Sequence, residues 1–176
     1  MHRKQSTSSV LDKENRRMAE VYKDFSAQKK EDRYIQLLHP CSVTSKSSHS
    51  GAILPPISLA YLAATLRGAG YPVKIIEAQG DDIFNIRLSE CGDYNIQGLS
   101  TEEILLRIKP ETKILGVTLL YSYEWLIQRD VIKAIKARFP KIIIVVGGEH
   151  PTALPEYVLR DCPEVDFIVS GEGEFT

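Results

Sequence analysis

The residues best suited to chemistry follow apolar segments that we expect to be strands. Gly147-Gly148-Glu149-His150 follows one such segment, and Gly171-Glu172-Gly173 follows another. Glycine lets a flat or bulky ligand approach the backbone closely, and it leaves N–H groups free to meet anionic or carbonyl oxygens. Either segment alone could be an ordinary turn. Two of them at the ends of adjacent strands indicate a large open cleft.

His150 is the most distinctive single residue in these loops. Its imidazole could donate a hydrogen bond to a cofactor side chain, or the residue could cap a helix at 152–160. We favour these roles over a metal ligand or a catalytic acid or base. The reason is that no second His, Cys or carboxylate pairs with His150 in the sequence at a metal-ligand spacing.

Several familiar sites do not fit the loops. The loop after the first strand holds one glycine, Gly51, whereas a dinucleotide fold requires G-x-G-x-x-G there. No G-x-x-x-x-G-K-[ST] phosphate loop occurs. A receiver domain needs acids after the first strand, Asp after the third and Lys after the fifth, but the residues found are His39, Thr118 and Ser170.

The elements that must position these loops alternate along the chain. Strands are predicted at residues 34–38, 73–76, 113–120, 141–146 and 165–169. Helices are predicted at residues 55–68, 100–109, 123–138 and 155–160. Ser100 and Glu103 form a capping box at the start of the second helix. The alternation predicts an α/β fold with a doubly wound, parallel five-stranded sheet, which binds ligands beyond the carboxyl ends of its strands.

Composition limits the class of protein further. The 176 residues are 43% apolar and 26% charged with a net charge of −1, which suits a globular domain and disfavours a nucleic-acid partner. The longest aliphatic run, Ile142–Val146, is too short to span a bilayer, so we expect no membrane partner. Three widely spaced cysteines indicate reduced thiols, and therefore a cytoplasmic protein.

Residues 1–33 differ from the rest of the chain. They hold nine Lys or Arg and six Asp or Glu, a net charge of +3. We expect a loosely attached polar leader, with a short helix where Met18, Val21, Tyr22 and Phe25 recur at helical spacing. A basic nucleic-acid arm is a weaker alternative because acidic residues are interleaved. The domain proper is predicted at 34–176, with a polar excursion at 78–99.

Taken together, these segments resemble the N-terminal cobalamin-binding domain of B12-dependent radical S-adenosylmethionine enzymes. The resemblance covers residues 34–176 and is carried by the segments Pro55–Ala64, Gly68–Tyr71, Val73–Glu77, Gly147–Ala153 and Val165–Glu174. It implies a flavodoxin-like (Rossmann-like) fold that binds cobalamin. It also implies methyl transfer to, or rearrangement of, an unactivated carbon, with a [4Fe–4S] cluster and S-adenosylmethionine in a downstream radical domain. The C-x-x-x-C-x-x-C motif of that domain is not in this sequence, so we predict a chain truncated before it.

The resemblance also implies where cobalamin would bind. The corrin is a broad, mostly apolar disc edged with amides, and Leu119, Leu120, Tyr121 and Tyr123 would form its platform. Hydroxyl groups would supply hydrogen bonds, and the glycine loops would admit the nucleotide tail. The D-x-H-x-x-G motif that supplies a cobalt ligand in other cobalamin proteins is missing, so we predict no metal ligand. Because the cofactor would carry the chemistry, we also predict no catalytic acid or base. The candidate cofactor-binding residues are Thr118, Leu119, Leu120, Tyr121, Ser122, Gly147, Gly148, Glu149, His150, Thr152, Ser170, Gly171, Glu172 and Gly173.

One alternative belongs to another functional class: a non-catalytic, flavodoxin-like regulatory or assembly module without cobalamin. Uptake of hydroxocobalamin with a shifted visible spectrum would distinguish the two. If the glycine loops admit a ligand, Gly148→Val is expected to weaken ligand binding more than folding.

Overall fold

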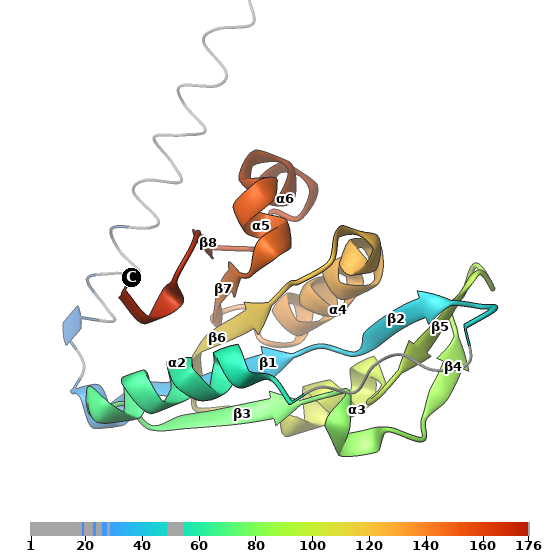
Figure 1. The fold of residues 1–176 in the computed structure, drawn as a ribbon. Helices are drawn as coiled ribbons and strands as arrows, with labels where there is room; N and C mark the ends of the chain where they lie inside the picture. The colour runs from blue at the N-terminus through green and yellow to red at the C-terminus, as the bar shows by residue number, and fades with distance from the viewer. Residues whose placement is uncertain (1–18, 20–22, 24–25, 28, 49–54, 176) are drawn as a thin grey trace, which may run out of the picture.

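The computed structural model describes residues 29–48 and 55–175, together with residues 19, 23, 26 and 27. Figure 1 shows a central sheet with helices beside it, and a small second sheet that extends beyond one end. The helix expected around Met18, Val21, Tyr22 and Phe25 falls on residues outside the described set. No helix among the described residues is long and apolar enough to cross a membrane.

The central sheet has five parallel strands, as the sequence predicts. They lie in the order β3-β1-β6-β7-β8. Their bounds are β1 Tyr34–His39, β3 Val73–Glu77, β6 Thr112–Thr118, β7 Ile143–Gly147 and β8 Phe167–Val169. This is the strand order of flavodoxin-like folds, in which the direction of winding reverses between β1 and β6. The doubly wound α/β fold is therefore confirmed, and the carboxyl ends of β1 and β6 mark the expected ligand site.

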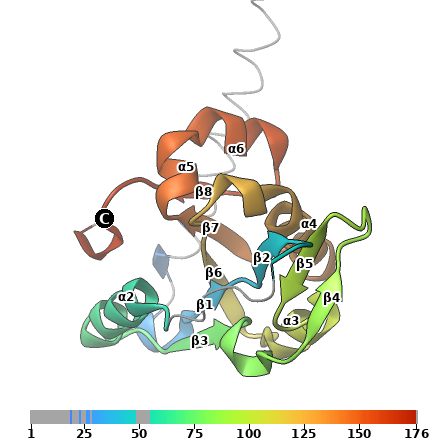
Figure 2. The same ribbon diagram turned by 45° about the vertical axis from the view of Figure 1, so that its right-hand side comes forward.

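Each face of the sheet packs against its own helices (Figure 2). Alternate side chains of β1 point to opposite faces because successive residues of a strand do so. Ile35 and Leu37 pack with Leu59 and Ala63 of helix α2, whereas Leu38 belongs to the larger core on the other face. That core also receives side chains from three more helices, α3, α4 and α6. The bounds of these helices are α2 Ile57–Gly68, α3 Thr101–Arg107, α4 Trp125–Arg138 and α6 Pro155–Asp161.

The four predicted helices are present where the sequence places them, but their first or last residues differ from the predicted ones. Ser100 Oγ accepts a hydrogen bond from the Glu103 N–H at 3.2 Å, and Glu103 Oε2 accepts one from the Ser100 N–H at 2.7 Å. This confirms the capping box and lowers the pKa of Glu103. Before α4, Ser122–Glu124 forms a 3-10 turn, η3, in place of the first helical turn predicted from residue 123. A short helix, α5 (Glu149–Ala153), was not predicted.

A second, antiparallel sheet replaces two segments that the sequence predicts as loops. Its strands, in the order β2-β5-β4, are β2 Ser42–Ser45, β5 Tyr94–Gln97 and β4 Ile86–Leu88. Strands of three or four residues with mixed polarity give almost no periodic signal. Tertiary contacts hold this sheet in place: Val43 is fully buried, and the Arg87 guanidinium donates to the carbonyls of Gly98 and Leu99 at 2.6 and 2.9 Å.

The three thiols provide a direct test of this packing. Cys91 is exposed, whereas Cys41 and Cys162 are buried. Burial raises the pKa of both buried thiols, that of Cys162 to about 12. Because thiolate is the reactive form, we expect iodoacetamide at about pH 8 to label Cys91 alone in the folded protein and all three cysteines in urea. Intact mass measures the number of labels, and rapid native labelling of two sites would contradict the packing.

Candidate functional site

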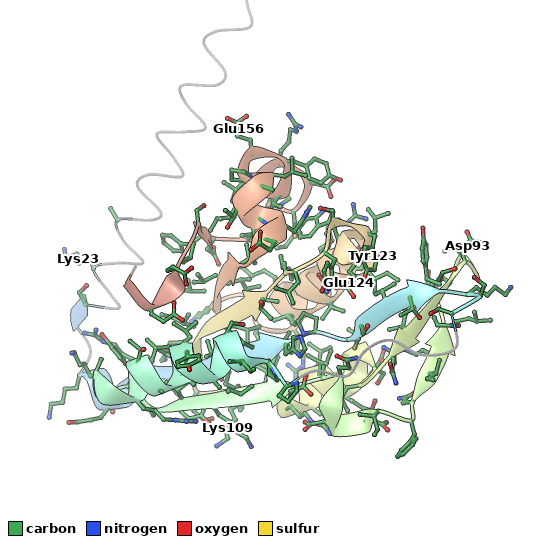
Figure 3. The ribbon with its side chains drawn as sticks, in the orientation of Figure 1. Lys23, Asp93, Lys109, Tyr123, Glu124 and Glu156 are labelled. Atoms are coloured by element: carbon green, nitrogen blue, oxygen red, sulfur yellow. The ribbon has the colours of Figure 1, made fainter. Side chains whose placement is uncertain are left out.

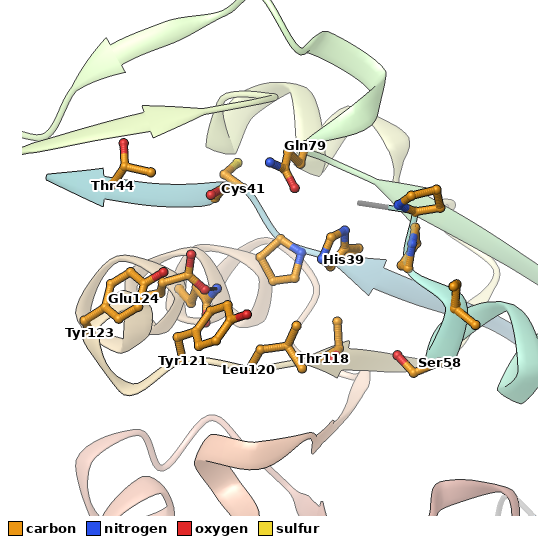
Figure 4. Close-up of a pocket in the computed structure, with 16 residues that line it drawn as sticks. His39, Cys41, Thr44, Ser58, Gln79, Thr118, Leu120, Tyr121, Tyr123 and Glu124 are labelled. Atoms are coloured by element: carbon orange, nitrogen blue, oxygen red, sulfur yellow. Dashed lines mark hydrogen bonds between the residues drawn. The ribbon is translucent and has the colours of Figure 1, made fainter. Parts of the chain in front are cut away.

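A polar cleft of about 330 Å³ opens at the carboxyl ends of β1 and β6. This is the point where the winding of the sheet reverses, and where ligands of such folds bind. Figure 4 shows Thr118, Leu120 and Tyr121 of the β6 end along one wall, with His39 and Cys41 of the chain leading into β2 opposite them. The small antiparallel sheet thus contributes one side of the cleft.

Two polar side chains of the α4 region line this cleft while being almost fully buried. Glu124 is 6% exposed and Gln128 is 4% exposed. Glu124 Oε1 accepts a hydrogen bond from the Val43 N–H at 2.9 Å, and Oε2 accepts one from Gln128 Nε2 at 3.0 Å. Burial raises the pKa of Glu124, while these two hydrogen bonds and His39 act in the opposite direction. Figure 3 shows Glu124 and Tyr123 beside β2 at the start of α4.

Other polar groups around the cleft are already bonded within the fold. His39 Nδ1 pairs with Glu77 Oε1 at the ends of the neighbouring strands β1 and β3, and Glu77 Oε2 accepts from the Gly80 N–H. The Cys41 thiol donates to the Leu99 carbonyl at 2.8 Å. These bonds join β1, β3 and the small sheet, so they shape the cleft.

An aromatic and aliphatic ledge stands at the mouth of the cleft. The rings of Tyr121 and Tyr123 stack with centroids 5.4 Å apart, and both side chains are more than half exposed. Leu120 beside them is also exposed. Leu119 departs from its predicted place in the platform, because its side chain is fully buried in the core. Only its backbone takes part at this edge, donating to the Gly147 carbonyl and accepting from the His150 N–H.

An apolar groove of about 380 Å³ continues from the cleft along the α2 face of the sheet. Thr118 and Leu120 line both hollows, the cleft and the groove. The groove runs between α2 and the strands β6, β7 and β8. Its apolar lining includes Leu59, Leu62, Leu66, Ile114, Val145 and Val169.

Glycines keep the carboxyl end of this groove open. A Cβ at Gly147 would make only ordinary contacts, the nearest at 3.5 Å from the Val169 carbonyl oxygen. At Gly173 the nearest atoms would lie 3.9 Å away, and at Gly171 none would lie within 4 Å. A side chain at any of these three positions would therefore occupy part of the open space.

Gly148 has a different role from the one expected. Its φ is +110° and its ψ −173°, a conformation that essentially only glycine adopts. A Cβ there would lie 2.6 Å from the Leu119 carbonyl oxygen. Gly148 therefore allows the loops after β6 and β7 to touch one another. The expectation that Gly148→Val would weaken binding more than folding is corrected: the substitution would first disrupt the fold.

His150 is buried in the interior next to the site. It is 2% exposed, and its ring centroid is 5.1 Å from that of Trp125. Ser122 Oγ and His150 Nδ1 are hydrogen-bonded at 2.9 Å, which ties the loop after β6 to α5. In the described residues His150 Nε2 has no hydrogen-bond partner, and burial lowers the pKa of the ring. His150 thus supports the loops and lines neither hollow.

The titration of His150 should be visible in the stability of the protein. Because the folded state disfavours the imidazolium, stability is fully present above the ordinary pKa of 6.5 and falls as the pH drops below it. We expect His150→Leu to reduce this loss of stability at acid pH. Urea unfolding at about pH 7.5 and about pH 5.5 measures the difference. Equal losses in the two proteins would contradict a buried neutral imidazole.

The structure brings together nine of the fourteen candidate residues. The hollows are lined by Thr118, Leu120, Tyr121, Gly147, Gly148, Glu149, Gly171, Glu172 and Gly173. The other five do not line them: Leu119, Ser122, His150, Thr152 and Ser170. Thr152 supports the loop after β8, since its Oγ1 accepts from the Gly171 N–H at 3.4 Å. Among the described residues, no three His, Cys, Asp or Glu side chains gather as a metal site would require.

Glu124 and Gln128 are not among the site residues predicted from the sequence. A signal was present in their spacing: the two residues are four apart, so they share one side of a helix. Gln128 falls among the apolar residues Trp125, Val131 and Ile132 that α4 buries. A polar side chain at a buried helical position indicates a specific partner.

Three relatives show the kind of protein in which this domain occurs. An uncharacterized methyltransferase of Pyrococcus horikoshii is 32% identical over 128 residues, 72% of this chain and 24% of the relative. The anaerobic magnesium-protoporphyrin IX monomethyl ester cyclase of Rubrivivax gelatinosus is 33% identical over 121 residues, 68% and 19% of the two chains. The cobalamin-dependent radical SAM methyltransferase TokK of Streptomyces tokunonensis is 37% identical over 60 residues, 33% and 9% of the two chains.

The chain thus spans a quarter or less of the length of these relatives. The family model described as the B12 binding domain matches residues 47–176, which include α2, β6 to β8 and every glycine of the groove. This match confirms the resemblance found in the sequence. The chain belongs to the B12 binding domain family.

Proposed function

We propose that this chain binds cobalamin at the carboxyl edge of the sheet, as the cobalamin domain of a radical S-adenosylmethionine enzyme. The observation that carries the proposal is the apolar groove beside α2, which opens at Gly147, Gly171 and Gly173 and joins the cleft at Thr118 and Leu120. A ligand with a broad disc and a narrow tail suits a ledge that leads into a groove. Both hollows fall within the usual size of cofactor sites.

The residues at each part of the site fit the chemistry of the cofactor. Leu120, Tyr121 and Tyr123 present exposed apolar surface for the corrin disc. The groove, lined mainly by aliphatic side chains, would take the nucleotide tail. Glycine backbone at its entrance would let phosphate and amide oxygens meet N–H groups closely. No side chain of this chain is needed as an acid or base, because the cofactor supplies the reactivity and the protein positions it.

The reaction of the whole protein is proposed from the relatives. When bound, cobalamin would act as the carrier of a carbon group such as methyl. This chain would hold the cofactor and shield one face of the corrin from water. The relatives named above are methyltransferases and a cyclase. We therefore propose methyl transfer to, or rearrangement of, an unactivated carbon, with a [4Fe–4S] cluster and S-adenosylmethionine in a downstream domain of the same polypeptide.

Titration with hydroxocobalamin tests the proposal. We expect the visible spectrum to shift on addition of the protein, and the coloured cofactor to elute with the protein on gel filtration. A dissociation constant in the micromolar range or below would support the site. The absence of any uptake at high micromolar cofactor would contradict it, and would favour a flavodoxin-like module without cobalamin.

The buried position of His150 predicts the spectrum of a variant. His150→Ala is expected to leave the visible absorption of bound cobalamin unchanged, with an affinity at most about tenfold weaker, the size of one lost hydrogen bond. His150 is 2% exposed and lies against Trp125, so it should act only through the loops. A clear displacement of the main visible band in the variant would instead identify His150 as a cobalt ligand.

A further inference from the structure

The polar cleft contains a site that only accepts hydrogen bonds. Glu124 accepts from Val43 and Gln128, and these bonds use two of the roughly four lone-pair positions of its carboxylate. Gln128 commits its Nε2 to Glu124, so its amide orientation is fixed. Its Oε1 remains buried without a hydrogen-bond partner among the described residues. Glu124 and Gln128 thus bring to the lining of the cleft a carboxylate with unused acceptor positions and an enclosed amide oxygen that has no partner.

An occupant of this site must bring hydrogen-bond donors. A buried acceptor without a partner is unfavourable, and a buried carboxylate more so. Among the residues that the structure describes, no Lys or Arg lines the cleft, so no permanently charged cation offsets the Glu124 carboxylate there. A primary carboxamide carries two N–H donors and no charge. A ligand carboxylate would bring only acceptors and a repelling charge.

The position of the site relative to the groove identifies the donor. Thr118 and Leu120 border both the groove and the cleft. Tyr121 and Tyr123 line the cleft at its exposed mouth. A corrin resting on this ledge with its tail in the groove would carry its rim across the cleft, and that rim is edged with primary amides.

We propose that Glu124 and Gln128 accept hydrogen bonds from a primary carboxamide on the corrin rim, and thereby select amidated corrinoids over corrin carboxylic acids. This inference rests on the proposed cobalamin binding. It adds a chemical selectivity that an apolar ledge and groove alone would not produce, since shape barely distinguishes an amide from a carboxylate.

The test compares hydroxocobalamin with the set of monocarboxylic acids in which each primary amide of the corrin rim, acetamide or propionamide, is in turn replaced by a carboxylate. We expect the wild-type chain to bind at least one of these acids about tenfold or more weakly than the parent, because like charges and unpaired acceptors oppose it. In the Glu124→Gln variant, the ratio of the dissociation constant of that acid to that of hydroxocobalamin should fall towards one. Gln128→Met keeps the length of the side chain but removes both the Oε1 acceptor and the Nε2 donor to Glu124, so it should weaken the binding of hydroxocobalamin itself.

Glu111→Gln is the matched control. It removes the same charge from an exposed residue just before β6, at the opposite edge of the sheet, and should keep the wild-type ratio. Wild-type protein that binds hydroxocobalamin and every monocarboxylic acid equally would overturn the inference and leave cobalamin binding intact. Wild-type protein that binds none of them would overturn both. The wild-type comparison decides even if a variant at the buried pair fails to fold.

Discussion

Gly147→Phe is expected to weaken cobalamin binding by more than about 100-fold while the protein keeps its fold. The new ring would occupy the apolar groove next to α2, where the Cβ itself makes only ordinary contacts with Val169. The ring would occupy space that the ligand needs. Losing a buried contact of the size of an aromatic ring lowers the binding free energy by roughly 3 kcal/mol or more. Cofactor titration by absorbance measures the affinity, and thermal unfolding measures the fold.

Gly68→Phe provides the control for this variant. It places the same ring at the exposed end of α2, where a Cβ would have no atom within 4 Å. Its affinity for cobalamin should equal that of the wild type. Undiminished binding by a folded Gly147→Phe protein would show that the groove holds no part of the cofactor.

Gly148→Val is expected to lower the free energy of unfolding by roughly 2–6 kcal/mol. One part is the backbone strain of a branched residue at φ +110°, about 1–3 kcal/mol. The other is overpacking against the Leu119 backbone, where the Cβ would lie 2.6 Å from a carbonyl oxygen, again about 1–3 kcal/mol. Whole domains are stable by only about 5–15 kcal/mol, so the midpoint of thermal unfolding should fall by roughly 5–20 °C.

Gly92→Val separates the two contributions to that loss. Gly92 also has a positive φ, +75°, but a Cβ there would meet nothing within 4 Å. Only the conformational part should therefore appear, about 1–2 kcal/mol. If Gly148→Val cost no more than Gly92→Val, the close contact between the loops after β6 and β7 would be refuted.

The small sheet and the polar cleft depend on contacts that local sequence patterns do not report. Gln128 and the capping box at Ser100 both leave a local trace, because helical spacing and cap chemistry act within a few residues. The hydrogen bond from Val43 to Glu124 joins residues 81 apart in the sequence. No local pattern reports such a contact, so β2 was predicted as a loop and Glu124 was not recognised as part of the site.

The sequence by itself determined the alternation of strands and helices, the parallel sheet, the glycine loops at its carboxyl edge and the resemblance to a cobalamin-binding domain. These follow from local periodicity, turn chemistry and short motifs. Only the tertiary structure decided that Leu119 and His150 face the interior, that Gly148 serves a contact between loops, and that Glu124 and Gln128 line the cleft. The physical reason is that burial and hydrogen bonding at the site depend on which strand ends meet, and strand neighbours such as β1 and β6 are chosen by packing across the whole sheet.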